Sequence, residues 1–187
     1  MLTEQIEATR ETNAEKYCQL VGRFSALVSD QVVAYLKDAN YFTAPSSFKK
    51  HGAWIGGNFD HSCKVTEFLL DYTEEENLKW EREESPYIIG LFHDMCKCDE
   101  RGFTEKDGGL KVISLNAIDK RHAEKSIELI EDNIITMTTE ERLCIYYHMG
   151  IYGGDYDYQV LMNKMIDENP NIRYVQMADT VAAKMGI

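Results

Sequence analysis

The segment Gly90-Leu91-Phe92-His93-Asp94-Met95-Cys96-Lys97 places an imidazole beside a carboxylate at the end of a short apolar run. On a helix, Lys97 follows Asp94 by three residues and His93 by four, so the three side chains can face one point. Imidazole nitrogens and carboxylate oxygens both bind borderline and hard divalent cations. Because a lone His-Asp pair is common by chance, its meaning depends on the rest of the chain.

The surrounding sequence favours helices throughout. Ser85-Pro86 and Asn169-Pro170 each predict an N-cap followed by a first helical residue, and Thr138 to Glu141 has the form of a capping box. Runs of alternating polar and apolar residues flanked by hairpin turns are not evident. The fold class is therefore predicted to be all-α, a single-domain helical bundle. Apolar residues recur at helical spacing in three further stretches: Val65, Phe68, Leu69 and Tyr72; Ala123, Ile127 and Ile130; Val175, Ala178, Val181, Ala182 and Met185.

Two segments stand apart from these stripes. Residues 1–44 are predicted to form one or two amphipathic helices that pack on the core, within one structural domain overall. The stretch from Cys98 to Arg121 contains three glycines and lacks periodicity, so a long loop is expected there. A disordered linker and a lid that contacts substrate both stay open for this loop.

Charge and cysteine content narrow the function classes. Asp and Glu outnumber Lys and Arg by 32 to 20, for a net charge of −12, which argues against a protein that grips long nucleic acids through their phosphates. A small phosphorylated substrate is compatible, because bound cations can reverse the potential inside a pocket. Five scattered cysteines and no apolar run long enough for a membrane span predict a cytoplasmic protein with reduced thiols.

The His-Asp pair belongs to an ordered set of His61, His93-Asp94, His122, His148 and Asp179. In this set the chain resembles the HD-domain superfamily of metal-dependent phosphohydrolases, over residues from about 45 to 183. The first segment is similar to the HD domain of bacterial three-prime exoribonucleases, and the later ones are similar to small HD hydrolases of bacteria and phages. The segments that carry the likeness are His51 to Ser62, Gly90 to Lys97, His122 to Ser126, Tyr147 to Gly150 and Met177 to Ala182.

The resemblance implies that residues 45–187 form an HD-type metal-binding helical domain. It implies hydrolysis of a phosphate ester or anhydride, in a nucleotide or related small molecule, by metal-bound hydroxide. The cofactor would be one or two divalent ions, of Mn, Fe, Co, Ni or Mg. The resemblance implies a first metal on His61, His93, Asp94 and Asp179, and a second on His122 and His148 with Asp94 bridging. From charge and residue type we expect catalysis by Asp94 and Lys97, and substrate contacts from Lys97, Lys125, His51 and Trp54.

Departures from the family pattern leave alternatives open. Met95-Cys96 stands where glycine and an aliphatic residue are usual, and Arg121-His122-Ala123 replaces a Gly-His-Gly. No oligonucleotide-binding barrel is evident, so short single-stranded RNA is the less favoured substrate. A di-iron oxygenase on the same fold and a non-catalytic regulator that binds a nucleotide or metal are the competing functions. The predicted substrate contacts have structural alternatives: solvated positions for the lysines, a loop hydrogen bond for His51 and rim packing for Trp54. The sequence does not indicate the oligomeric state.

Overall fold

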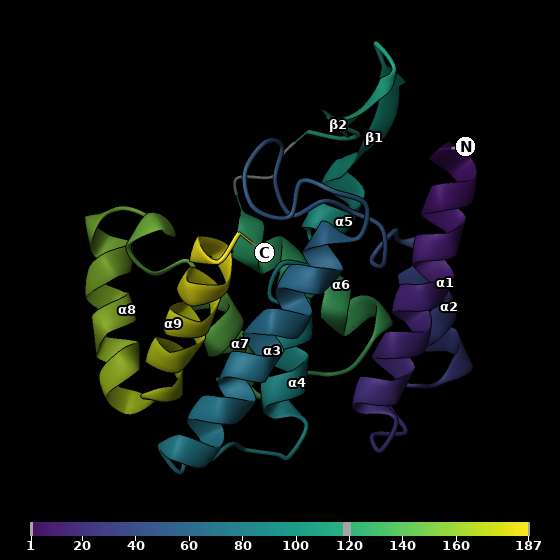
Figure 1. Ribbon diagram of the computed structural model, residues 1–187. Helices are drawn as coiled ribbons and strands as arrows, with labels where there is room; N and C mark the ends of the chain where they lie inside the picture. The colour runs from purple at the N-terminus through teal and green to yellow at the C-terminus, as the bar shows by residue number, and fades with distance from the viewer. Residues whose placement is uncertain (1, 118–120, 187) are drawn as a thin grey trace.

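The computed structural model describes residues 2–117 and 121–186, and these confirm the all-α fold with one small addition, a two-stranded hairpin (Figure 1). Among the described helices, none is long and apolar enough to cross a membrane. In chain order the elements are α1 (Leu2–Val21), α2 (Asp30–Asp38), α3 (Gly57–Glu75), α4 (Ser85–Phe92), α5 (Lys97–Glu100), β1 (Arg101–Lys106), β2 (Gly109–Ser114), α6 (His122–Asn133), α7 (Thr139–Tyr147), the 3-10 turn η1 (Gly150–Tyr152), α8 (Tyr156–Glu168) and α9 (Asn171–Lys184).

Helix α3 lies at the centre of the molecule, where it packs against α4 and α9. Its approach to α4 depends on Gly90, because a Cβ there would lie 2.7 Å from Thr66 Cα. Helix α4 is short and entirely buried, which explains why its sequence is apolar on every side. The central helices therefore meet tightly at the level of the His-Asp pair.

Helices α4, α7 and α9 run in the same direction. At their first turns, Ser85 Oγ donates to Glu141 at 2.9 Å, and Asn171 Nδ2 donates to Glu140 at 2.8 Å. Arg82 donates two hydrogen bonds of 2.8 Å to the Glu141 carboxylate. We call the cluster of Arg82, Ser85, Glu140, Glu141 and Asn171 the N-terminal network.

The N-terminal helices pack on the same hydrophobic core as the rest of the chain. Tyr17 of α1 makes edge-on contacts with Tyr41 and Phe42 and lies against Phe92 at the end of α4. The Tyr41 hydroxyl donates to the carbonyl of Leu91 at 2.6 Å. This contact ties the segment after α2 to the helix that leads into the His-Asp pair. The division of the chain at residue 44 stays a prediction.

The helix boundaries and capping signals follow the sequence closely. The capping box at Thr138 and Glu141 is confirmed, while α4 and α9 start one residue away from prediction, with Glu84 and Pro170 as N-caps. Helix α8 begins after an Asp155 cap that the apolar pattern did not reveal.

The long loop predicted from Cys98 to Arg121 is wrong over most of its described part, and residues 118–120 of this prediction lie outside the described residues. It contains α5 and the antiparallel pair β1 and β2, which projects from the helical body (Figure 1). The turn between the strands has positive φ at Asp107 and at Gly108. Asp-Gly is a strong hairpin signal, but the strands are half-exposed and show no regular alternation of buried and exposed residues.

Candidate metal centre

Four helices and the segment after α4 bring the predicted ligands together. His61 lies near the start of α3. This helix begins directly after Gly56, whose φ of +84° is a conformation that glycine adopts readily. His93 and His148 are the C-cap residues of α4 and α7. His122 is the first residue of α6. Asp179 lies in the middle of α9, so the site joins residues from both ends of the matched sequence pattern.

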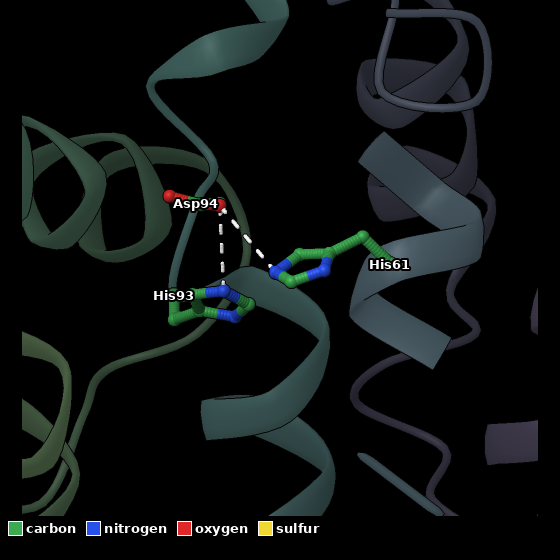
Figure 2. A group of neighbouring side chains, drawn as sticks. All are labelled: His61, His93 and Asp94. Atoms are coloured by element: carbon green, nitrogen blue, oxygen red, sulfur yellow. Dashed lines mark ion pairs between the residues drawn. The ribbon is translucent and has the colours of Figure 1, made fainter. Parts of the chain in front are cut away.

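The first group of ligand atoms surrounds Asp94 Oδ2. His93 Nε2 lies 3.4 Å from this oxygen and His61 Nε2 lies 3.9 Å from it (Figure 2). Asp179 Oδ1 is 3.0 Å from His61 Nε2 and 3.8 Å from His93 Nε2. His61, His93 and Asp94 are all buried and close enough together to hold one metal ion.

The second group surrounds the other oxygen of the same carboxylate. His122 Nε2 lies 2.6 Å from Asp94 Oδ1, and His148 Nε2 lies 3.8 Å from it. These three side chains can also hold one ion. Since each oxygen of Asp94 faces a different group, the carboxylate is placed to bridge two cations.

The ring orientation of two histidines leaves a lone pair free for a metal. His93 Nδ1 lies 3.0 Å from the carbonyl of Gly90, and His148 Nδ1 lies 2.6 Å from the carbonyl of Ile145. A carbonyl only accepts, so each Nδ1 carries a proton, and in the neutral imidazole each Nε2 has a lone pair. Within the described part of the chain, both Nε2 atoms are buried without a hydrogen-bond partner. Buried polar atoms of this kind fit a cation that the protein binds from outside.

Burial and charge set the protonation of the ligands. Burial, reinforced by the neighbouring His93, lowers the pKa of His148 to about 4, so this imidazole is neutral at pH 7. Burial alone would raise the pKa of Asp179, but the hydrogen bond from His61 and the nearby imidazole of His93 outweigh it and hold that pKa at about 2. Both groups are therefore in the protonation state that a metal ligand requires.

The carboxylate of Asp94 is ionised and surrounded by donors. Burial would raise its pKa, yet the positive charge of Lys97, the adjacent imidazole of His93 and the hydrogen bond from His122 bring it well below the usual range. In turn, burial would lower the pKa of His122, but its hydrogen bond to Asp94 raises it to about 10. A proton on His122 thus neutralises Asp94 where a cation would otherwise do so.

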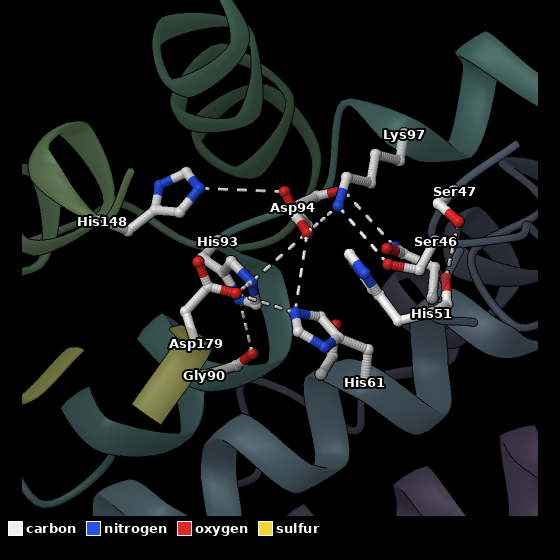
Figure 3. A network of polar contacts seen from close by, with 12 residues as sticks. Ser46, Ser47, His51, His61, Gly90, His93, Asp94, Lys97, His148 and Asp179 are labelled. Atoms are coloured by element: carbon white, nitrogen blue, oxygen red, sulfur yellow. Dashed lines mark hydrogen bonds and ion pairs between the residues drawn. The ribbon is translucent and has the colours of Figure 1, made fainter. Parts of the chain in front are cut away.

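Lys97, Ser46 and His51 border the centre on the side opposite His148 (Figure 3). Lys97 is largely buried, its Nζ contacts Asp94 Oδ2 and it lies 3.5 Å from Ser46 Oγ. The ring of His51 lies 5.5 Å from that of His61. Lys97 and His51, two of the predicted substrate contacts, thus lie beside the ligands, and their substrate roles stay predictions. Ser46 is an addition that no sequence pattern indicated.

Two predicted substrate contacts lie elsewhere. Trp54 is 42% exposed and donates its indole N–H to Asp60 at 2.8 Å. It borders two surface cavities on the α1 side of α3, and neither cavity is lined by a proposed metal ligand. The Nζ of Lys125 lies 2.8 Å from Asp99 Oδ1, and this carboxylate neutralises its charge. The structure therefore gives neither residue a contact with the ligand groups, and their substrate roles stay predictions.

A cavity of about 280 Å³ opens beside the two groups. It is lined by His148 and Asp179 together with Gln176, Thr180 and the η1 turn. Tyr152 of this turn is 83% exposed and also borders a second cavity that reaches His122. Each of these cavities is lined by at least one proposed ligand.

Comparison with known proteins gives one match. The family model described as HD domain matches residues 58–184, a range that contains every member of the two ligand groups. No curated protein and no solved structure matches the chain significantly. The likeness to three-prime exoribonucleases therefore stays a prediction.

Proposed function

The chain belongs to the HD-domain family, and from this premise we propose that it hydrolyses a phosphate ester or anhydride in a nucleotide or related small molecule. One observation carries the proposal. Two buried imidazole nitrogens, on His93 and His148, face a shared carboxylate and have no hydrogen-bond partner among the described residues. A histidine that served only to stabilise the core would be expected to have both ring nitrogens satisfied.

The two groups assign the residues that would hold the cations. His61, His93, Asp94 and Asp179 would hold one ion, and His122, His148 and Asp94 would hold another. Bound divalent cations attract phosphate, polarise its oxygens and lower the pKa of water towards neutrality. A purely histidine and carboxylate donor set suits Mn, Fe, Co, Ni or Mg, with Mg the least favoured by imidazole.

Lys97 supplies a positive charge at the edge of the centre. Its contact with Asp94 and its position 3.5 Å from Ser46 Oγ keep it facing the ligands rather than solvent. As the phosphoryl oxygens gain negative charge, this ammonium group is placed to stabilise them. His51 borders the same side and would contact the substrate, since its ring lies beside His61.

The cavity beside His148 and Asp179 supports a small substrate. A phosphate held by the ions would direct the rest of the molecule towards the η1 turn, where Tyr152 is exposed. A surface with a net charge of −12 disfavours long polyanions. The proposed partner is therefore a small phosphorylated compound, with a nucleotide as the first candidate.

The test is a phosphate-release screen with the purified protein, stripped of metal and then reloaded with each of the five metals. Nucleotides, cyclic nucleotides, short RNA and p-nitrophenyl phosphate would serve as substrates, with Asp94→Asn as the control. The proposal expects turnover of at least one nucleotide that disappears with chelation and in the control. Tight nucleotide binding without turnover under every metal would contradict it and favour a regulatory role.

A further inference from the structure

Cys96 lies next to the proposed centre, yet neither ligand group includes it among the described residues. Its side chain is fully buried, and its Sγ lies 2.9 Å from Nδ1 of His122. The other nitrogen of the same ring, Nε2, lies 2.6 Å from Asp94 Oδ1. The imidazole is therefore held at both nitrogens by side chains from one three-residue segment.

The other histidines of the centre show what this contact does. In His93 and His148, Nδ1 donates to a carbonyl of the last turn of the helix that the residue ends. The last carbonyls of a helix have no intrahelical partner, so they are free to accept this bond. Fixing the proton on Nδ1 leaves Nε2 as the ligand nitrogen.

His122 cannot use that arrangement, because it begins a helix rather than ending one. The first turn of a helix presents unsatisfied N–H donors, and its carbonyls accept bonds from the following turn. The ring of His122 therefore needs an acceptor from another part of the chain. The sulfur of Cys96 lies at that position.

A second contact ties the same cysteine to α6. The backbone N–H of Cys96 donates to Ser126 Oγ at 3.1 Å, and that hydroxyl lies 3.2 Å from the carbonyl of His122. Ser126 is one turn after His122, so both ends of the first turn of α6 are fixed to the segment after α4. Sulfur is a weak but adequate acceptor for an imidazole N–H.

We propose that Cys96 is a positioning residue for the second metal, whose thiol accepts the Nδ1 proton of His122 and directs Nε2 towards Asp94. The inference rests on the proposed function, since it assigns a role within the same centre. It also gives a role to the position at which the sequence departs from the usual family pattern.

The experiment measures metal binding to the metal-free protein by calorimetric titration with Mn²⁺, and compares Cys96→Ala and Cys96→Ser with wild type. Cys144→Ala is the matched control, because Cys144 is equally buried but lies in α7 and belongs to neither of the two described ligand groups. We expect two ions in wild type and in the control. Cys96→Ala should keep the first ion and bind the second about 10-fold to 100-fold more weakly, as loss of an outer partner does, while Cys96→Ser restores much of the affinity.

A Co²⁺-substituted sample adds a readout that separates positioning from direct ligation. The expected spectrum lacks a thiolate-to-cobalt charge-transfer band; a band that Cys96→Ser removes would make Cys96 a ligand and overturn the inference. Equal binding of both ions by Cys96→Ala and wild type would overturn this inference but not the proposed function. Equal losses in Cys96→Ala and Cys144→Ala would do the same. A wild type that binds a single ion also overturns it, and one that binds no ion overturns the proposed function as well.

Discussion

Helices α4, α7 and α9 share two polar clusters of different kinds. Ser85, Glu140 and Asn171 belong to the N-terminal network, and the residue eight positions after each of them is His93, His148 and Asp179. Eight helical residues span about 12 Å. The same three helices therefore present one polar layer near their starts and a second one about two turns later.

The layers differ in how their polar atoms are satisfied. In the N-terminal network, Glu141 accepts bonds from Arg82, Ser85 and the backbone of Thr138, and Glu140 accepts from Asn171 and the backbone of Glu81. In the metal centre, two buried nitrogens have no hydrogen-bond partner in the described chain. A layer completed by the protein itself serves the fold, whereas one left incomplete indicates an external ligand.

Asp94→Asn would give the largest effect and would test the metal layer. Because Asp94 faces both groups, its loss should abolish binding of both ions and lower phosphate release by about a thousandfold or more, the several kcal/mol that cations supply. Wild type should gain about 2.7 kcal/mol of unfolding free energy at a metal concentration near 100 times Kd. Urea unfolding with and without Mn²⁺ would show whether the variant still has this gain. A gain as large as in wild type would contradict the assignment of this layer to metal binding.

Glu141→Ala tests the opposite layer. Removing this carboxylate leaves Arg82 and Ser85 without their shared acceptor, so the free energy of unfolding should fall by about 3 kcal/mol. The number of ions bound and the Mn²⁺-dependent gain should stay as in wild type. Loss of metal together with stability would mean that the two layers are coupled.

Lys97→Ala should have a smaller effect, confined to turnover. The ammonium group contacts the carboxylate but is not a metal ligand, so kcat should fall by about 10-fold to 100-fold while both ions stay bound. Steady-state kinetics with metal analysis would measure this, with Lys64→Ala on the α1 side of α3 as the control. An unchanged kcat would assign Lys97 a structural role only.

The smallest effect concerns pH and Glu140. Burial raises the pKa of this carboxyl group above its ordinary value, so the folded state takes up a proton at a higher pH than the unfolded state does. Its contribution to stability therefore increases as the pH falls from 7 towards the unfolded pKa near 4.5. Urea unfolding of wild type and Glu140→Gln between pH 7 and 5 should show that gain in wild type alone. Parallel profiles would show that Glu140 does not titrate in this range.

Much of the fold followed from local signals. The capping box at Thr138 and the prolines at the starts of α4 and α9 are short-range features, and a sequence carries them directly. The hairpin was missed because its strands are half-exposed and irregular, although Asp107-Gly108 carried the signal of its turn. Helix α8 was missed because its only clear marker is the Asp155 cap.

The site was predictable in its ligands and less so in their surroundings. The spacing of histidines and aspartates was recognisable because a metal needs those residue types, whatever the packing around them. The contacts of Ser46 with Lys97 and of Cys96 with His122 depend on how distant segments pack. Trp54 turned towards Asp60 for the same reason, since its orientation follows from the turn before α3 rather than from its residue type.

The parallel course of α4 and α7 has an electrostatic consequence. The aligned peptide groups of a helix place partial negative charge at its carboxyl end, which favours a nearby cation. His93 and His148 are the residues at which α4 and α7 end. The backbone therefore attracts a positive ion to this layer even before the charge of any side chain is counted, while the amino ends of the same helices lie beside the carboxylates of Glu140 and Glu141.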